Sequence, residues 1–443
     1  MSPIRTQVVL DDDPTGTQTV HDVPVLARWS EDRIASLFAE KAPVFYLLTN
    51  SRSLSAADSA ELHRELIGTI IRAAKRTGTD FDVISRGDST LRGHYPLEPD
   101  TIRQVMQDEA GVTYDGELLI PFFEEGGRIT EGDVHYIAGP DGRIPVGQSE
   151  FAHDATFGYA SSNLREWIQE KTNGRVAADG VLSVSLDDIR AGGPPRVAEI
   201  LSDATANARV VVNAVTYADL EPFCRGLADA ESRGKRFLFR TAASFVRARA
   251  GIVPRPLLER EELVSGNGSG VLCIVGSHVK KTTRQLHHAL QHPSRIGLEL
   301  DVARVIGEQC ERYLDGLRAE IDGRLSAGET VVVYTSRQLR RESSSRSERN
   351  LDVSVRISRA LAALVKSVSA APRCIIAKGG ITSSDIAVHA LGVSRARVMG
   401  QVLPGIPVWR LGEGSKHPGL AYVIMPGNVG DDNALSAILA TVE

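Results

Sequence analysis

Cysteine is scarce in this chain and widely spaced where it occurs. The 443 residues contain only four cysteines, and no two of them form a C-x-x-C pair. This spacing gives no sign of a disulfide framework or a zinc site, so we expect reduced cysteines that pack in the interior. The four are Cys224, Cys273, Cys310 and Cys374.

Long apolar runs and a strong excess of one charge are also missing. No apolar stretch approaches the roughly 20 residues that span a bilayer, and the N-terminus lacks the charged-then-apolar pattern of a signal peptide. We therefore expect a cytoplasmic protein without a membrane partner. The net charge of -5 is small for this length and gives no reason to expect a nucleic-acid partner.

Two common signatures of nucleotide-binding proteins are absent as well. The chain has no G-x-x-x-x-G-K-[ST] stretch and no G-x-G-x-x-G after an expected strand. Any nucleotide site must therefore be of another kind than a P-loop or a dinucleotide fold.

What the sequence does contain is an alternation of short β-branched runs with helical patterns. Residues 56–75 carry apolar side chains at the 3.6-residue period behind Ser55, an expected N-cap, and residues 302–325 carry a similar stripe. Strands that alternate with such helices predict an α/β fold with mainly parallel sheets covered on both faces. The expected strands lie at residues 8–10, 44–48, 81–85, 118–120, 210–214, 237–239, 271–275, 331–335, 373–377 and 421–425.

One stretch separates these elements into two sets. Residues 253–270 contain two prolines, a glutamate-rich patch and the run SGNGSG, which is typical of a linker. We therefore predict two α/β domains, residues 1–252 and residues 271–443, joined by this linker.

Polar clusters follow three expected strands of the first domain. Asp12 and Asp13, with a third aspartate before them, come directly after residues 8–10, and adjacent carboxylates need a cation or hydrogen-bond donors in compensation. Arg52 follows residues 44–48, and Arg86 opens the cluster behind residues 81–84, whose further members are Gly87, Asp88, Ser89 and Arg92. Because open α/β sheets bind ligands at their strand ends, these residues predict a site for a small hydroxylated anion.

Glycines follow the strands of the second domain in the same way. In residues 378–385, KGGITSSD, a strand opens through Gly379 and Gly380 into a helix start, a geometry that offers backbone N-H groups to a phosphate. Gly276 with Ser277, and Gly427, follow two further strands. Three such strand ends in one domain predict a nucleotide cradle.

Taken together, these motifs resemble the four-carbon acid sugar kinases, which phosphorylate threonate, erythronate or 3-oxo-tetronate with ATP. The resemblance spans both halves of the chain. It rests on Asp-Asp-x-Thr-Gly at 12–16, Asn-Ser-Arg at 50–52, Arg-x-Asp-Ser-Thr-x-Arg-Gly at 86–93, Gly-Ser at 276–277, Lys-Gly-Gly-x-Thr-Ser at 378–383, Leu-Pro-Gly at 403–405 and Pro-Gly-Asn-x-Gly at 426–430.

The resemblance implies an N-terminal domain that holds the sugar acid and a C-terminal domain that holds ATP, with the active site in the interdomain cleft. The residues that would contact the sugar acid are Asp12 or Asp13, Arg52, Arg86, Gly87, Asp88 and Ser89. Those that would line the nucleotide are Ser277, Gly379, Gly380, Ile381, Thr382 and Gly427.

Phosphoryl transfer to a hydroxyl needs an aligned acceptor, positive charge around the phosphoryl group and a base. We expect Asp12 or Asp13 as the base, Arg52 and Arg86 as a clamp on the sugar-acid carboxylate, and Lys378 beside the phosphates. The chemistry also implies Mg²⁺, whose water shell Asp431 or Asp432 could reach.

Two other functions use the same features. An ATP-dependent ligase that activates a carboxylate would need similar glycine turns, and a sugar-acid sensor would bind both ligands without turnover. The sequence leaves the sugar acid, the phosphorylated hydroxyl and the oligomeric state open, and a homodimer is compatible with it.

Overall fold

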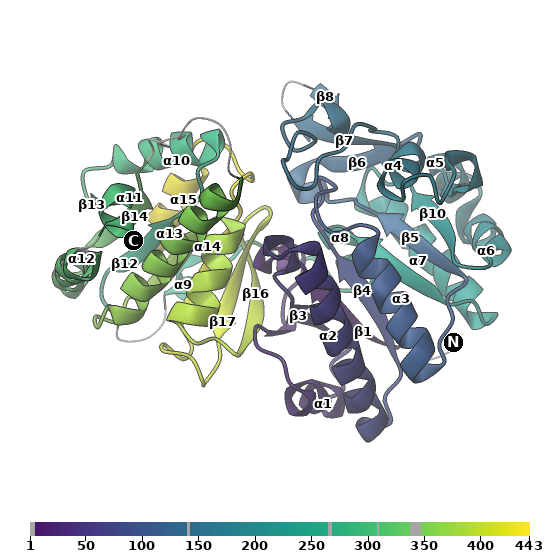
Figure 1. Cartoon of the computed structure of the whole chain (residues 1–443), viewed down its shortest axis with the longest axis horizontal. Helices are drawn as coiled ribbons and strands as arrows, with labels where there is room; N and C mark the ends of the chain where they lie inside the picture. Colours follow the sequence, from purple (N-terminus) through teal and green to yellow (C-terminus); the bar gives the residue numbers. More distant parts are fainter. Residues whose placement is uncertain (1–4, 140–141, 265–267, 308–309, 337–346) are drawn as a thin grey trace. The chain divides into compact units, whose positions relative to one another are not determined.

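The computed structural model describes residues 5–139, 142–264, 268–307, 310–336 and 347–443, with the backbone alone from 347 to 355. The chain divides into two compact units, Met1–Pro254 and Arg255–Glu443. Each unit is built on a mainly parallel sheet with helices on its faces, as predicted (Figure 1). None of the described helices is both long and apolar enough to cross a bilayer.

The sheet of the first unit is parallel throughout, in the order β2-β3-β1-β4-β11-β5-β10-β9. The chain leaves β1 towards β3 on one side and later returns to β4 on the other, so β1 lies at the point where the strand order reverses. The strands are β1 Thr6–Asp11, β2 Pro24–Leu26, β3 Val44–Leu48, β4 Phe81–Arg86, β5 Gly116–Ile120, β9 Leu182–Val184, β10 Ala208–Val212 and β11 Phe237–Thr241.

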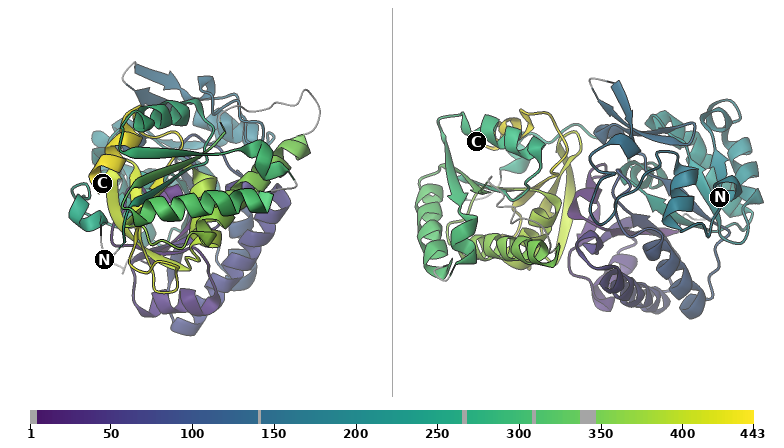
Figure 2. Two further views of the ribbon diagram at one scale, coloured as in Figure 1. Left: turned by 90° about the vertical axis from the view of Figure 1, so that its left-hand side faces the viewer. Right: turned by 45° about the horizontal axis from the view of Figure 1, so that its top comes forward.

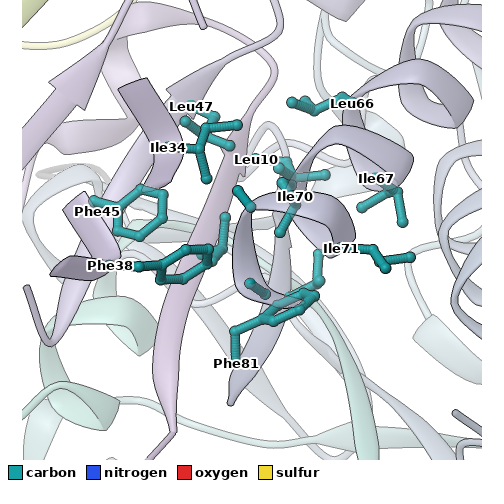
Figure 3. Close-up of a cluster of buried hydrophobic side chains, with 14 of the residues drawn as sticks. Leu10, Ile34, Phe38, Phe45, Leu47, Leu66, Ile67, Ile70, Ile71 and Phe81 are labelled. Atoms are coloured by element: carbon teal, nitrogen blue, oxygen red, sulfur yellow. The ribbon is translucent and has the colours of Figure 1, made fainter. Parts of the chain in front are cut away.

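Helices cover both faces of this sheet, and successive side chains of β11 pack against different helices on the two faces. Leu238 packs in the core formed with α1, α2 and α3, whereas Phe239 stacks on Phe245 of α8 at 5.3 Å between ring centroids. Figure 3 shows the first of these cores, with side chains such as Leu10, Phe45 and Ile70 pointing towards one another. The helices are α1 Glu31–Ala39, α2 Ala56–Thr77, α3 Leu97–Ala110, α4 Leu164–Lys171, α5 Leu186–Arg190, α6 Gly193–Asp203, α7 Tyr217–Ser232 and α8 Ala243–Arg249.

The predicted N-cap of α2 is confirmed, since the Ser55 hydroxyl accepts a hydrogen bond from the Asp58 amide at 3.1 Å.

A small antiparallel sheet follows β5 and was not predicted. Its strands are β6 Arg128–Glu131, β7 Val134–Gly139 and β8 Gly142–Pro145. The side chains of β6 mix polar and apolar types, and those of β7 and β8 are also partly exposed, so the segment lacks the apolar run of a buried strand.

The sheet of the second unit is parallel over β13-β14-β12-β15-β18 and antiparallel at β17 and β16. Here β12 lies where the strand order reverses, between β14 and β15. The strands are β12 Val271–Val275, β13 Arg295–Leu300, β14 Thr330–Thr335, β15 Cys374–Lys378, β16 Arg395–Leu403, β17 Ile406–Leu411 and β18 Ala421–Met425. Strands β13, β16 and β17 were not predicted.

The helices of the second unit also lie on both faces of its sheet (Figure 2). On one face α10 and α15 share a core with the side chains of Val271, Cys273 and Val275. Leu258 and Leu263, inside the predicted linker, are buried in this same core, while residues 265–267 lie outside the described residues. The helices are α9 Arg260–Leu263, α10 Lys280–Leu290, α11 Val302–Ile306, α12 Cys310–Ser326, α13 Ser347–Ser367, α14 Gly380–Asp385 and α15 Ala434–Val442.

Two details differ from the predictions for this unit. The stripe at residues 302–325 was predicted as one helix but forms two, because Gly307 follows the end of α11 in an extended conformation. The four cysteines are free as expected, but only Cys273 and Cys374 are fully buried.

Candidate functional site

The polar clusters of the first unit meet at one edge of its sheet. Asp11 ends β1 and Arg86 ends β4, and the two are direct neighbours in the parallel register. On the other side of β1, the Thr49 amide donates to the Asp11 carbonyl at 2.9 Å, which brings the turn after β3 to the same place. The expected convergence of three strand ends is therefore present.

Arg86 is the buried centre of this edge. Its Nη1 donates to Oδ1 of Asp11 and to Oδ1 of Asp12, each at 3.1 Å, and all three side chains are almost fully buried. One guanidinium thus compensates two adjacent carboxylates, the arrangement that the aspartate run requires.

Arg52 links the neighbouring carboxylates. It lies in the short helical turn Ser51–Ser53 and pairs closely with Oδ2 of Asp13, while its Nη1 lies 3.9 Å from Asp12 Oδ2 and 3.6 Å from Asp88 Oδ1. The other oxygen of Asp13 accepts the Thr15 amide at 2.7 Å and caps the turn Pro14–Thr17. Asp13 therefore has both oxygens engaged.

Asp88 is held ionised by its neighbours. Arg92 Nε donates to its Oδ2 at 2.7 Å, and the Thr90 hydroxyl forms a close hydrogen bond with the same oxygen. Burial acts to raise the pKa of Asp88, but the charges of Arg92 and Arg52 outweigh it and hold the pKa well below the usual range.

Asp11 is shifted towards its protonated form. Burial raises its pKa to about 7, and the neighbouring Asp12 adds to this shift against the opposing charge of Arg86. Its carboxylate fills the space beside Gly16, where a Cβ atom would stand 2.0 Å from Asp11 Oδ1. Gly16 is thus the residue that lets the turn pass close over Asp11.

Asp12 carries an oxygen that is still available. Its Oδ2 is buried and accepts no hydrogen bond from any described residue, and Arg52 at 3.9 Å is an ion-pair neighbour only. A buried carboxylate oxygen in this condition is a good acceptor for a ligand hydroxyl.

A second layer of charge supports this edge, and sequence reasoning missed it. Arg240, near the end of β11, donates to Ser85 Oγ at 2.8 Å and to Glu98 Oε2 at 2.6 Å. It also fills the space beside Gly87, where a Cβ atom would lie 2.5 Å from Nη2. A charged residue inside the run FLFRT was the available signal, because a lone arginine in a buried strand needs a buried acid.

Gly87 and Ser89 flank Asp88 in the loop that follows β4. The Gly87 amide donates to the Thr241 carbonyl at 2.9 Å, and the Ser89 carbonyl faces His135 Nε2 at 2.8 Å. The loop is thus tied both to the main sheet and to the small antiparallel sheet.

The glycine turns of the second unit come together in a similar way at the ends of β12, β15 and β18. A Cβ atom on Gly276 would lie 2.1 Å from Thr382 Oγ1, one on Gly379 would lie 3.1 Å from Ser277 Cβ, and one on Gly427 would lie 2.9 Å from Ser277 Oγ. Gly379 has a φ of 116°, which side chains rarely adopt, whereas Gly380 already belongs to α14.

Lys378 and Ile381 of this turn differ in solvent exposure. The Lys378 side chain is fully buried, and its Nζ donates to the Pro426 carbonyl at 3.0 Å, which ties β15 to the turn after β18. Ile381 is 57% exposed. The Lys378 ammonium is thus buried beside the turn after β18.

The two metal candidates lie in the turn after β18 and have other contacts. Asp432 is exposed and pairs with Arg284 Nε at 2.9 Å, and Asp431 Oδ1 accepts the Asn433 amide at 3.1 Å. Among the described residues, no group of three or more potential ligands could hold a metal ion. Mg²⁺ bound mainly through phosphates and water needs no such group.

Comparisons with known proteins cover nearly the whole chain. A family model described as a sugar-binding N-terminal domain matches residues 7–249, and one described as a nucleotide-binding C-terminal domain matches residues 272–435. The D-threonate kinase of Salmonella typhimurium is 24% identical over 420 residues, which are 91% of this chain and 90% of that protein.

Two solved structures share the fold over 98% of this chain. A Salmonella typhimurium protein described as a putative tRNA synthase matches over 98% of its own length, with a TM-score of 0.68 and 16% identity. A Haemophilus influenzae protein of the DUF1537 family matches over 100% of its length, with a TM-score of 0.62 and 17% identity.

Proposed function

Since this chain belongs to the four-carbon acid sugar kinase family, we propose that it transfers the γ-phosphate of ATP to a hydroxyl of a four-carbon sugar acid. The distant D-threonate kinase relative makes threonate the first substrate to test. The observation that carries the proposal is the buried network of aspartates and arginines at the strand ends of the first unit, with one carboxylate oxygen left open.

In this proposal the first unit binds the sugar acid. Asp12 accepts the proton of the attacking hydroxyl through its open oxygen, while Asp13 positions Arg52 rather than acting as the base. Arg86 pairs with Asp12 at 3.1 Å and orients it. Gly87, Asp88 and Ser89 form the wall against which the substrate hydroxyls would bind.

The second unit binds ATP over its glycine turns. The N-H groups that follow Gly379, with Thr382 and Ser277, face the phosphates, and Gly427 leaves room for them. Lys378 adds positive charge from beside the turn after β18. When bound, Mg²⁺ would neutralise charge on the β- and γ-phosphates, and Asp431 and Asp432 stay candidates for contacting its water ligands. Phosphoryl transfer requires the sugar acid and ATP to come into contact. That this happens in a cleft between the two units stays a prediction.

The proposal is tested by ADP release from the full chain with ATP, Mg²⁺ and a panel of four-carbon sugar acids. Asp12→Asn should lower kcat about 100-fold or more without changing the affinity for ADP, because it removes only the proton acceptor. Asp13→Asn should also lower turnover, but through a raised KM for the sugar acid as Arg52 loses its partner. Equal turnover of Asp12→Asn and wild type would remove Asp12 from the role of base.

A further inference from the structure

Each arginine at the strand ends of the first unit already serves a carboxylate of the protein. Arg52, Arg86 and Arg92 all lie in ion pairs with aspartates of the network. A ligand carboxylate would have to displace these partners or share them, and either costs part of the energy of a buried pair. The acid group of a substrate is better served by a cation without such a partner.

Arg128, at the start of β6, is such a cation. Its side chain is almost fully buried, and none of the described carboxylates lies within ion-pair distance of it. Its Nη1 forms a close hydrogen bond with the Gly126 carbonyl, but its buried Nε has no hydrogen-bond partner. Burying a guanidinium in this condition is costly unless an anion arrives to compensate it.

The acids that precede Arg128 in the chain are engaged elsewhere. Glu124 accepts the Tyr217 amide at 2.7 Å, and Glu125 pairs with Arg247 at 3.3 Å. The unbalanced charge of Arg128 is therefore not relieved by its own loop.

The register of the small sheet turns Arg128 towards the loop that carries Asp88. Arg128 and Thr130 are two residues apart on β6, so their side chains share one face. On that face the Thr130 hydroxyl contacts His135 Nδ1 at 2.9 Å, and His135 Nε2 reaches the Ser89 carbonyl at 2.8 Å.

The electrostatics agree with this placement. Burial lowers the pKa of Arg128, while the charge of Asp88 raises it and that of Arg92 lowers it, so both groups are within electrostatic range.

We propose that Arg128 binds the carboxylate of the sugar acid and makes the protein select an acid over the corresponding amide or alcohol. The planar guanidinium can pair with a carboxylate through two parallel N-H groups, which a neutral ligand cannot match. The inference rests on the proposed function for the identity of the ligand, but the anion site itself does not require turnover.

Isothermal titration of the full chain with D-threonate, with its C1 amide and with ADP tests the proposal. Wild type should prefer the acid to the amide, and Arg128→Met should lower the affinity for the acid about 10- to 100-fold while leaving the affinities for the amide and ADP unchanged. Arg128→Lys keeps the charge without the planar fork and should fall between the two. Arg143→Gln is the matched control, because Arg143 belongs to the same small sheet but is exposed and pairs with Glu131.

The outcomes separate this inference from the proposed function. If the Arg128→Met protein keeps the preference of wild type for the acid, or loses acid and amide affinity equally, Arg128 only supports the Gly126 turn and the inference is wrong. If wild type binds no four-carbon acid, it is wrong as well. Arg128-dependent acid binding in a protein that releases no ADP would uphold the inference and refute the kinase.

Discussion

Gly276 offers a direct test of how closely the glycine turns of the second unit pack. A Cβ atom at this position would stand 2.1 Å from Thr382 Oγ1 and 3.0 Å from its Cγ2, far inside ordinary contact. The backbone of Gly276 does not have the positive φ that disfavours side chains, so the strain of Gly276→Ala is steric. Thr382 is buried in the first turn of α14 and has little room to yield.

We expect Gly276→Ala to destabilise the second unit by about 1–3 kcal/mol, the usual cost of overpacking. If the start of α14 shifts, affinity for ADP should fall about tenfold for each 1.4 kcal/mol lost from binding. Affinity for the sugar acid should not change, because its proposed site lies in the first unit. Urea unfolding and calorimetric titration with ADP measure the two effects.

A double-mutant cycle shows whether Thr382 is the cause. Thr382→Ala removes both Oγ1 and Cγ2 and leaves only Cβ at 3.1 Å, so Gly276→Ala should cost clearly less in that background. Gly323→Ala in α12 is the control, since a Cβ there meets nothing within 4 Å and should be neutral or stabilising. Equal costs of Gly276→Ala in both backgrounds would refute the packing described here.

Three further predictions concern the first unit. The pKa of Asp11 is raised from 3.8 to about 7, so its contribution to stability is present below pH 3.8 and is lost as pH rises from 3.8 through 7. In urea unfolding, Asp11→Asn should therefore gain stability relative to wild type across that same range and no further above it. Burial lowers the pKa of His135 from 6.5 to about 4, so its contribution is lost as pH falls through that range, and His135→Gln should flatten the acid limb of the same curve. Gly16→Ala places a Cβ 2.0 Å from Asp11 Oδ1 and should weaken sugar-acid binding, but not ADP binding, in calorimetric titrations.

The parallel core of each unit could be predicted because its strands are short, apolar and bounded by polar residues. The run at 44–48 matches β3, and the run at 271–275 matches β12. The expected strand at 210–214 is β10, which lies two residues earlier, because the chain leaves the main sheet after Val212 and Ala214 forms a bridge with Thr130 of β6 instead.

Other parts could not be predicted because their pattern depends on tertiary packing. Strands β16 and β17 carry arginines and a proline among their apolar residues, and β7 and β8 are partly exposed. No local signal separates such segments from loops.

The same limit applies to the site. The positions of Asp12, Asp13, Arg52 and Arg86 at one sheet edge followed from strand ends alone. Which carboxylate has an open oxygen, and which arginine lacks an acid, depends on side-chain pairing across elements far apart in the chain.

The central claim is that this chain phosphorylates a hydroxyl of a four-carbon sugar acid, and ³¹P NMR of the full chain with ATP, Mg²⁺ and D-threonate tests it most directly. We predict equal amounts of ADP and of a phosphate monoester whose signal survives hydroxylamine. A hydroxylamine-sensitive acyl phosphate would contradict the account. So would the binding of four-carbon sugar acids if none of them gave a new phosphorus signal.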